Sequence, residues 1–314
     1  MRSFGLAAAL LCASIPAAAS QPIAKVQLPC ESASQMLSPT GAQLAVECKD
    51  KSVQLVDIPA GSARVVFPAG QSPNTTAYSP DGRWLAAGFT DGSVEVIATG
   101  DTASTRRWKA GSHRIDLLYF FPNGTDLFVG PVDSPGQVWE LSQIPTQRAT
   151  LPFDFGGIAA IAVSSDGKLL AAVGDDTVLR WYDTATWQKT RDYRGFLLET
   201  FALQFTPDGK QLLAGGADSR LTIFDVATGK QVRQMPAEAG SSIGVLDVLS
   251  NTRASAVYFD NAGGKPPHTL LWDLAAATSV PIKSDSQPTC AGAVRGKLWV
   301  CSVDGKTLTV AQFE

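Results

Sequence analysis

The sequence predicts an all-β fold, a seven-bladed β-propeller, from a repeated turn, a repeated four-strand pattern and the length of the chain. A turn that ends in glycine returns every 41 to 43 residues through its first five copies, and two weaker copies follow. The turns lie at 38–41, 79–82, 122–124, 165–167, 207–209, 250–253 and 294–296. A repeat of about 40–45 residues that holds four short strands is typical of a propeller blade.

Residues 199–237 show the pattern of one blade most clearly. Alternating residues at 199–206 predict the first strand, strand a. Pro207-Asp208-Gly209 predicts a tight turn, because proline fixes φ and glycine accepts positive φ. Strands b, c and d are then expected at 211–217, 221–226 and 231–236. Strand c recurs in the other six repeats, at 52–58, 93–99, 137–142, 177–183, 269–274 and 307–313.

The N-terminal end of the chain predicts a secretory signal over 1–19. Arg2 gives a positive start, residues 5–15 are apolar, and Ala17-Ala18-Ala19 forms a small-residue cleavage site. The apolar run is about half of the ~20 residues that span a bilayer. Cys12 suggests a lipoprotein signal as an alternative, but the preceding Leu11 disfavours lipid anchoring. We therefore expect an exported protein, periplasmic or secreted, with a signal at 1–19, one propeller domain at 20–314 and no transmembrane segment.

The last repeat predicts how the ring closes. Only three strands are expected there, at 289–294, 297–303 and 307–313. Residues 23–29 precede the first strand a and resemble strand d at 231–236 in pattern. We predict that 23–29 completes the last blade, which would remove the exposed sheet edges of an open array.

An aromatic–acidic pair ends strand c in several repeats. It is Trp272-Asp273 in one repeat, with looser forms at Tyr182-Asp183, Phe224-Asp225, Trp139-Glu140 and Val56-Asp57. On these pairs and the repeat length, residues 20–314 resemble the WD-repeat β-propellers, here as a bacterial exported member. The Gly-His part of the family's signature survives only at Gly111-Ser112-His113. The resemblance implies that His113 and Asp133 form a buried, structural hydrogen-bonded pair. The other six blades lack the Gly-His signature that belongs to the family's usual His–Asp network.

Four cysteines follow the signal, an even number that predicts disulfides in an exported protein. Cys290 and Cys301 flank one turn symmetrically, and Cys30 and Cys48 flank the turn at Pro39 in the same way. Because opposed hairpin positions are within disulfide reach, we predict Cys30–Cys48 and Cys290–Cys301. Bridges between blades (Cys30–Cys290 or Cys48–Cys301) and free buried thiols are the alternatives. The cysteine spacing matches no metal-ligand motif, and the chain has only two histidines, so we expect no metal.

The candidate binding residues lie on one face of the predicted disc. Every b–c turn contains an aspartate: Asp50, Asp91, Asp133, Asp175, Asp218, Asp260 and Asp304. Aspartate favours tight turns by bonding its own backbone, so a structural role is the first expectation, although seven like charges would also focus a negative potential. The d–a connections of the same face carry aromatic residues, which either cap the core or anchor a partner. The binding set is therefore Asp91, Asp133, Asp175, Asp218, Phe153, Phe155 and Phe196.

Composition and motifs favour a binding protein over an enzyme. The formal net charge is −3 and 18% of residues are charged, so no basic excess favours nucleic acid. Gly240-Ser241-Ser242-Ile243-Gly244 matches a hydrolase elbow in its letters, but the strand before it and the helix after it are not predicted. We expect no catalytic residues and no cofactor. The predicted function is a monomeric, non-enzymatic scaffold of the bacterial periplasm that binds a protein or peptide; the alternative is a propeller enzyme resembling lactonases or dehydrogenase subunits.

Overall fold

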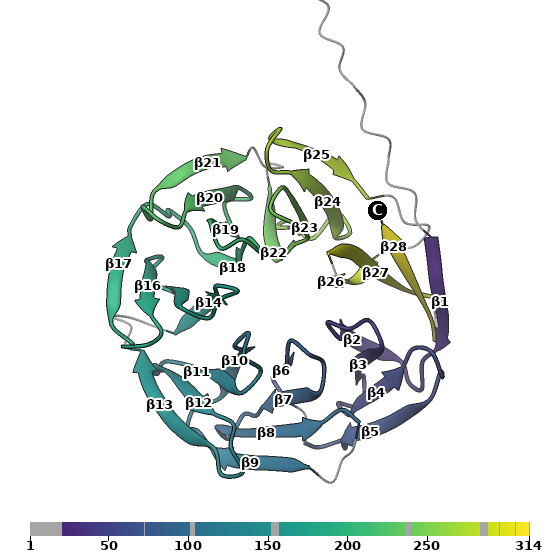
Figure 1. Ribbon diagram of the computed structural model, residues 1–314. Coiled ribbons are helices and arrows are strands. Elements are labelled where there is room, and N and C mark those ends of the chain that lie inside the picture. The colour runs from purple at the N-terminus through teal and green to yellow at the C-terminus, as the bar shows by residue number, and fades with distance from the viewer. Residues whose placement is uncertain are drawn as a thin grey trace, which may run out of the picture.

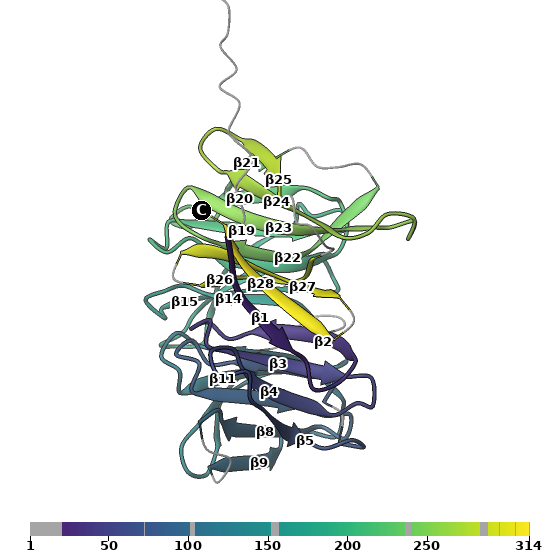
Figure 2. The ribbon, with the colours of Figure 1, turned by 90° about the vertical axis from the view of Figure 1, so that its right-hand side faces the viewer.

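Seven four-stranded antiparallel sheets surround a central axis in the computed structural model (Figure 1). The structure describes residues 21–313 except 72, 101–103, 152–156, 236–239, 283–287, 295 and 305. Seen from its edge, the molecule is a disc (Figure 2). The predicted seven-bladed β-propeller is confirmed.

Each blade runs from an innermost strand a to an outermost strand d. Blade one comprises β2 (Ser32–Leu37), β3 (Gln43–Cys48), β4 (Val53–Asp57) and β5 (Ala63–Phe67). Blade two comprises β6 (Thr75–Tyr78), β7 (Trp84–Gly88), β8 (Ser93–Ala98) and β9 (Thr105–Lys109). Blade three comprises β10 (Ile115–Phe120), β11 (Asp126–Pro131), β12 (Gly136–Glu140) and β13 (Thr146–Leu151). Blade four comprises β14 (Ile158–Val163), β15 (Leu169–Gly174), β16 (Leu179–Asp183) and β17 (Lys189–Tyr193).

The remaining blades follow the same order until the ring closes. Blade five comprises β18 (Thr200–Phe205), β19 (Gln211–Gly216), β20 (Leu221–Asp225) and β21 (Gln231–Met235). Blade six comprises β22 (Ser241–Val248), β23 (Arg253–Asp260), β24 (His268–Asp273) and β25 (Thr278–Pro281). Blade seven comprises β26 (Pro288–Val294), β27 (Lys297–Asp304), β28 (Thr307–Phe313) and β1 (Gln21–Gln27).

Small residues on strand b let neighbouring blades approach closely. A Cβ added to Gly88 would lie 2.6 Å from Ile115 of the next blade, and one added to Gly215 would lie 2.7 Å from Ile243. Four of the five residues of outer strand β21, by contrast, are exposed. The core therefore lies between the blades, and the outer strands face solvent.

The N-terminal strand closes the ring as predicted. Strand β1 pairs antiparallel with β28, with Lys25 opposite Thr309 and Val26 opposite Leu308. Its bounds lie two residues earlier than the expected 23–29. Val26 and Leu28 are buried in a cluster with residues of blades one and seven, so this seam has a hydrophobic core of its own.

Candidate protein-binding face

The b–c and d–a connections share one face of the disc, and most of the aspartates there stabilise their own turns. Asp50 accepts hydrogen bonds from the Ser52 backbone N–H at 2.9 Å and from its hydroxyl at 2.7 Å. Asp91 likewise accepts hydrogen bonds from the backbone N–H and the hydroxyl of Ser93, and it forms an ion pair with Lys109 at 3.1 Å. The Ser93 hydrogen bonds, supported by Lys109, hold the pKa of Asp91 well below its ordinary value. The expected turn role is confirmed at these positions.

Two adjacent aspartates in blade four have different partners. The Asp175 carboxylate accepts the backbone N–H of Gly157 at 2.8 Å, which ties the b–c turn to the d–a connection. Asp176 instead pairs with Arg180, whose side chain is 3% exposed. Asp175 therefore links two loops of this face, and Asp176 neutralises the charge of the buried Arg180 guanidinium.

The structure corrects the expected His113–Asp133 pair. His113 Nδ1 is 3.0 Å from the Ser134 hydroxyl oxygen, and both His113 and Asp133 are exposed rather than buried. Asp133 has a left-handed backbone with φ of 50°, which separates this turn from the Asp50 and Asp91 turns. The neighbouring serine, not the aspartate, is the residue within reach of the imidazole.

The aromatic–acidic pair in blade six also lacks a hydrogen-bonded network around its ring. In the described part of the chain the buried Trp272 Nε1 has no hydrogen-bond partner. Its cross-strand neighbour on β23 is Ala254, which has no side-chain acceptor. Trp272 therefore acts in this fold as a packing residue.

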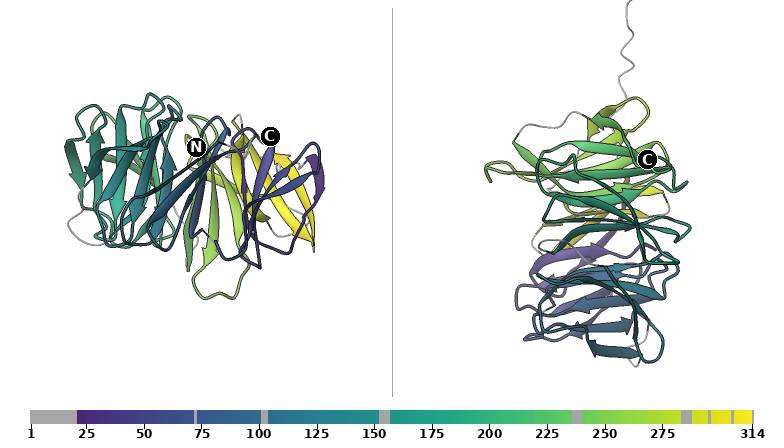
Figure 3. Two further views of the ribbon diagram at one scale, coloured as in Figure 1. Left: turned by 90° about the horizontal axis from the view of Figure 1, so that it is seen from below. Right: turned by 90° about the vertical axis from the view of Figure 1, so that its left-hand side faces the viewer.

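The longest b–c loop projects from this face. It joins β23 to β24 in blade six, and Figure 3 (left) shows it as a yellow-green loop that extends beyond its neighbours. Asp260 holds its base by accepting the backbone N–H groups of Lys265 at 2.9 Å and Gly264 at 2.7 Å. These bonds lower the pKa of Asp260. The predicted turn role of this aspartate is therefore confirmed even in a long loop.

The three candidate aromatic anchors have different outcomes. Phe153 and Phe155 lie outside the described residues. Phe196 packs edge-to-face on Tyr193 at 5.4 Å and on Phe224 at 5.8 Å between ring centroids. Phe196 is half-buried and covers the core of blades four and five, so it forms a wall rather than a projecting anchor.

A groove of about 430 Å³ brings two of the candidate binding residues, Phe196 and Asp218, together. We call it the blade 4–5 groove. Its apolar side follows the connection from β17 to β18, and its polar side follows the b–c turn of blade five and the outer strands β20 and β21. The lining residues used below are Tyr193, Phe196, Leu197, Leu198, Asp218, Arg220, Thr222, Gln231 and Gln234. Asp91, Asp133 and Asp175 do not line this groove.

Exposed leucines mark the rim of the groove. Leu197 is 91% exposed and Leu198 is 51% exposed. Phe201 on β18 and Phe259 on β23 are also large exposed apolar side chains, but they do not line the groove. Arg220, Gln231 and Gln234 were not predicted as site residues; the only sequence signal for Arg220 is its place two residues after the turn aspartate.

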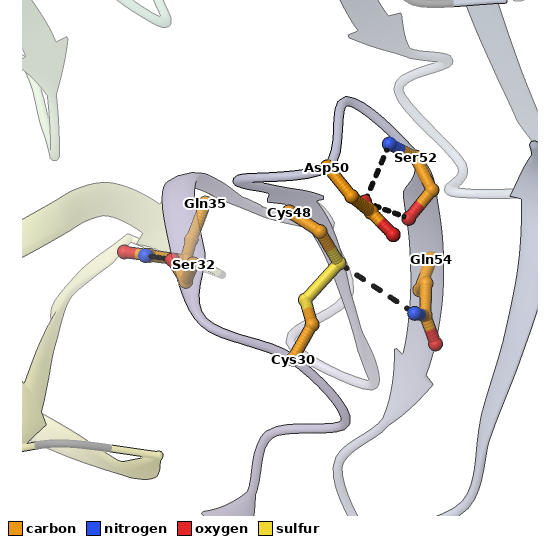
Figure 4. The surroundings of a disulfide bond; sticks show 7 residues. All are labelled: Cys30, Ser32, Gln35, Cys48, Asp50, Ser52 and Gln54. Atoms are coloured by element: carbon orange, nitrogen blue, oxygen red, sulfur yellow. Dashed lines mark hydrogen bonds between the residues drawn. A yellow bond between two sulfur atoms is a disulfide. The ribbon is translucent and has the colours of Figure 1, made fainter. Parts of the chain in front are cut away.

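The predicted Cys30–Cys48 disulfide is present at the seam of the ring (Figure 4). The two Cα atoms are 5.8 Å apart, and the Gln54 amide donates to Cys48 Sγ at 3.5 Å. Cys301 is also disulfide-bonded, and it is the register partner of Cys290 across β26 and β27. The structure does not describe the side chain of Cys290, so the Cys290–Cys301 bridge remains a prediction.

Two features are absent from the described residues. No group of three or more His, Cys, Asp or Glu side chains in this part of the chain could hold a metal ion. The same residues contain no helix long and apolar enough to cross a membrane.

The protein is therefore a seven-bladed β-propeller in which hydrogen-bonded turns and connections form one face of the disc. The WD domain, G-beta repeat family model matches residues 66–97, 146–183 and 199–225, so these three segments are similar to WD repeats. The chain is 24% identical over 148 residues to WD repeat-containing protein SL1-17 of Schistosoma mansoni, a match that covers 47% of this chain and about half (48%) of that relative.

Solved structures share the fold across nearly the whole chain. A chain in the crystal structure of the Mitotic Checkpoint Complex superposes with a TM-score of 0.76 at 17% identity, covering 99% of this chain and 98% of that one. The Myceliophteria thermophila Cps50 (Swd1) β-propeller domain gives 0.72 at 13% identity, covering 93% and 99%. At these identities the likeness describes the fold alone.

Proposed function

We propose that this propeller is a non-enzymatic scaffold that binds a protein or peptide through its b–c/d–a face. The observation that carries the proposal is the blade 4–5 groove, where the aromatic wall and exposed leucines of the β17–β18 connection meet charged and polar side chains of blade five. Interfaces concentrate their binding energy in such mixed apolar and polar patches. The similarity to WD repeats adds weight, since WD propellers commonly bind proteins.

We also propose that the protein works outside the cytoplasm, in the periplasm or as a secreted protein. Two observations support this location: the signal-like residues 1–19 and the Cys30–Cys48 disulfide. Disulfides persist in oxidising compartments and are rare in reducing ones. Cell fractionation of the untagged protein, with N-terminal sequencing of the mature chain, tests the location; a cytoplasmic chain that retains residues 1–19 would contradict it.

Site-specific photocrosslinking in the native cell tests the binding face. A photoreactive residue replaces Leu197 on the proposed face, and a matched one replaces Lys168 on an a–b turn of the opposite face. Both side chains are well exposed, at 91% and 80%. We expect a discrete crosslinked partner from position 197 and none from position 168. The reverse pattern would assign binding to the other face.

A further inference from the structure

We infer that the blade 4–5 groove takes an extended segment of the partner that carries an apolar side chain next to an acidic one. This inference rests on the proposed function and adds the chemistry of the occupant. It depends on three properties of the groove: an ordered apolar side, side-chain amides beside it, and one cation that has no acidic partner.

The apolar side is ordered by packing. Tyr193 contacts Phe224 at 4.9 Å between ring centroids, and Phe196 packs against both rings. Leu197 and Leu198 follow directly in the chain, yet most of Leu197 and about half of Leu198 remain in contact with water. A rigid aromatic wall beside two exposed leucines offers a pre-formed site for one apolar side chain, with little ordering required on binding.

The polar side presents amides that are already oriented. The Tyr193 hydroxyl donates to Gln231 Oε1 at 2.7 Å. Gln234 accepts from Arg220 at 3.0 Å through Oε1 and donates to the Thr222 hydroxyl at 3.4 Å. Both amides belong to β21, the outermost strand of its blade, and Gln231 is exposed. Side-chain amides both donate and accept, so this side suits the main chain of an extended peptide.

The charge requirement comes from Arg220. Its side chain is exposed, and its one described side-chain hydrogen bond goes to the neutral amide of Gln234. Within the described ranges no carboxylate lies within ion-pair distance of this guanidinium, and the Asp218 carboxylate accepts the backbone N–H of Arg220 instead. A guanidinium has five N–H donors and pairs best with a planar carboxylate. An acidic side chain in the occupant would supply that acceptor.

Phage display of random short peptides against the purified mature protein tests the inference. We expect the wild-type protein to enrich sequences with Leu, Ile or Phe beside Asp or Glu. Arg220→Glu should abolish the acidic preference and weaken binding of the enriched consensus peptide about tenfold, since it removes one attraction and adds a repulsion. Leu197→Ser should remove the apolar preference. Lys210→Glu is the matched control, because it reverses an exposed charge on the opposite face of the same blade and should bind as wild type.

Three results would overturn the inference: no enrichment of any peptide, a consensus without an acidic residue, or a consensus peptide that binds Arg220→Glu as tightly as wild type. Its failure is distinguishable from failure of the proposed function. If position 197 still crosslinks a partner in cells, the face binds a folded surface and only the segment chemistry is wrong; if neither experiment gives a signal, both proposals fail.

Discussion

The indole ring of Trp299 in blade seven lies directly against Gly41 in the first a–b turn of blade one. A Cβ placed on Gly41 would come within 2.6 Å of that ring, and the residue also has a positive φ of 73°. Trp299 packs against the buried cluster that β1 completes. The contact therefore joins the first and last blades of the ring at the point where the chain closes on itself.

Gly41→Ala should consequently destabilise the protein more than the same change at an equivalent turn. Gly167 is the matched control, because its φ is 72° but nothing lies within 4 Å of an added Cβ. We expect Gly167→Ala to cost about 1 kcal/mol from backbone strain alone. Gly41→Ala should cost about 1–3 kcal/mol more because it also overpacks the ring contact. Urea unfolding measures both, and equal losses would show that Trp299 moves aside freely.

Single substitutions in β1 can measure how much this closing strand contributes to stability. Val26 is buried in the seam cluster, whereas its neighbour Lys25 on the same strand is exposed. Val26→Ala should lower the free energy of unfolding by about 2 kcal/mol, through lost burial and a residual cavity. Lys25→Ala should change it by less than about 0.5 kcal/mol. A Val26 variant as stable as the Lys25 variant would mean that β1 contributes little to closure.

The Cys30–Cys48 disulfide should stabilise the same seam. It spans 18 residues, so on the chain-entropy model its removal costs about 3 kcal/mol. The double variant Cys30→Ser/Cys48→Ser should melt at a lower temperature than the wild type under non-reducing conditions. Non-reducing peptide mapping identifies the bridges directly, and a Cys30–Cys290 peptide would contradict the assignment. The variant Cys290→Ser/Cys301→Ser separates the effect of the second predicted bridge.

The buried Asp176–Arg180 pair should govern part of the acid sensitivity of the protein. Partial burial raises the pKa of Asp176, but the hydrogen bonds from Arg180 and the Val178 backbone, together with the charge of Arg180, outweigh it and leave the pKa lowered. A lowered pKa in the folded state means that the stabilisation is present above the pKa of about 4 in the unfolded chain and is lost as pH falls further.

Asp176→Asn should therefore destabilise the protein by about 3 kcal/mol at neutral pH, because it leaves Arg180 buried without a counter-charge. Below about pH 4 the difference in stability from wild type should narrow, because Asp176 is protonated first in the unfolded chain and, at still lower pH, in the folded protein. Asp91→Asn is the control: the Asp91–Lys109 pair is more than half exposed and should matter by less than about 1 kcal/mol. Thermal melts across pH check both, and a gap independent of pH would contradict the assigned role.

Sequence alone determined the repeat, the number of blades, the closing strand and the Cys30–Cys48 bridge. These features depend on short-range rules: alternation along a strand, turn residues at fixed steps, and cysteines opposite each other on a hairpin. The aspartates at 50, 91, 218 and 260 followed the same logic, because an aspartate in a tight turn bonds backbone N–H groups a few residues away.

Only the tertiary structure decided which side chains meet across blades. His113 lies within hydrogen-bond distance of Ser134 rather than Asp133, and Phe196 packs against Phe224 of the next blade. Backbone angles and the packing between blades determine these contacts. The groove depends on this packing too: Leu197, Arg220 and Gln234 belong to three separate segments that no local pattern connects. Strand periodicity specifies which face of a sheet a residue occupies, but the distance between residues on neighbouring blades is set by how the whole ring packs.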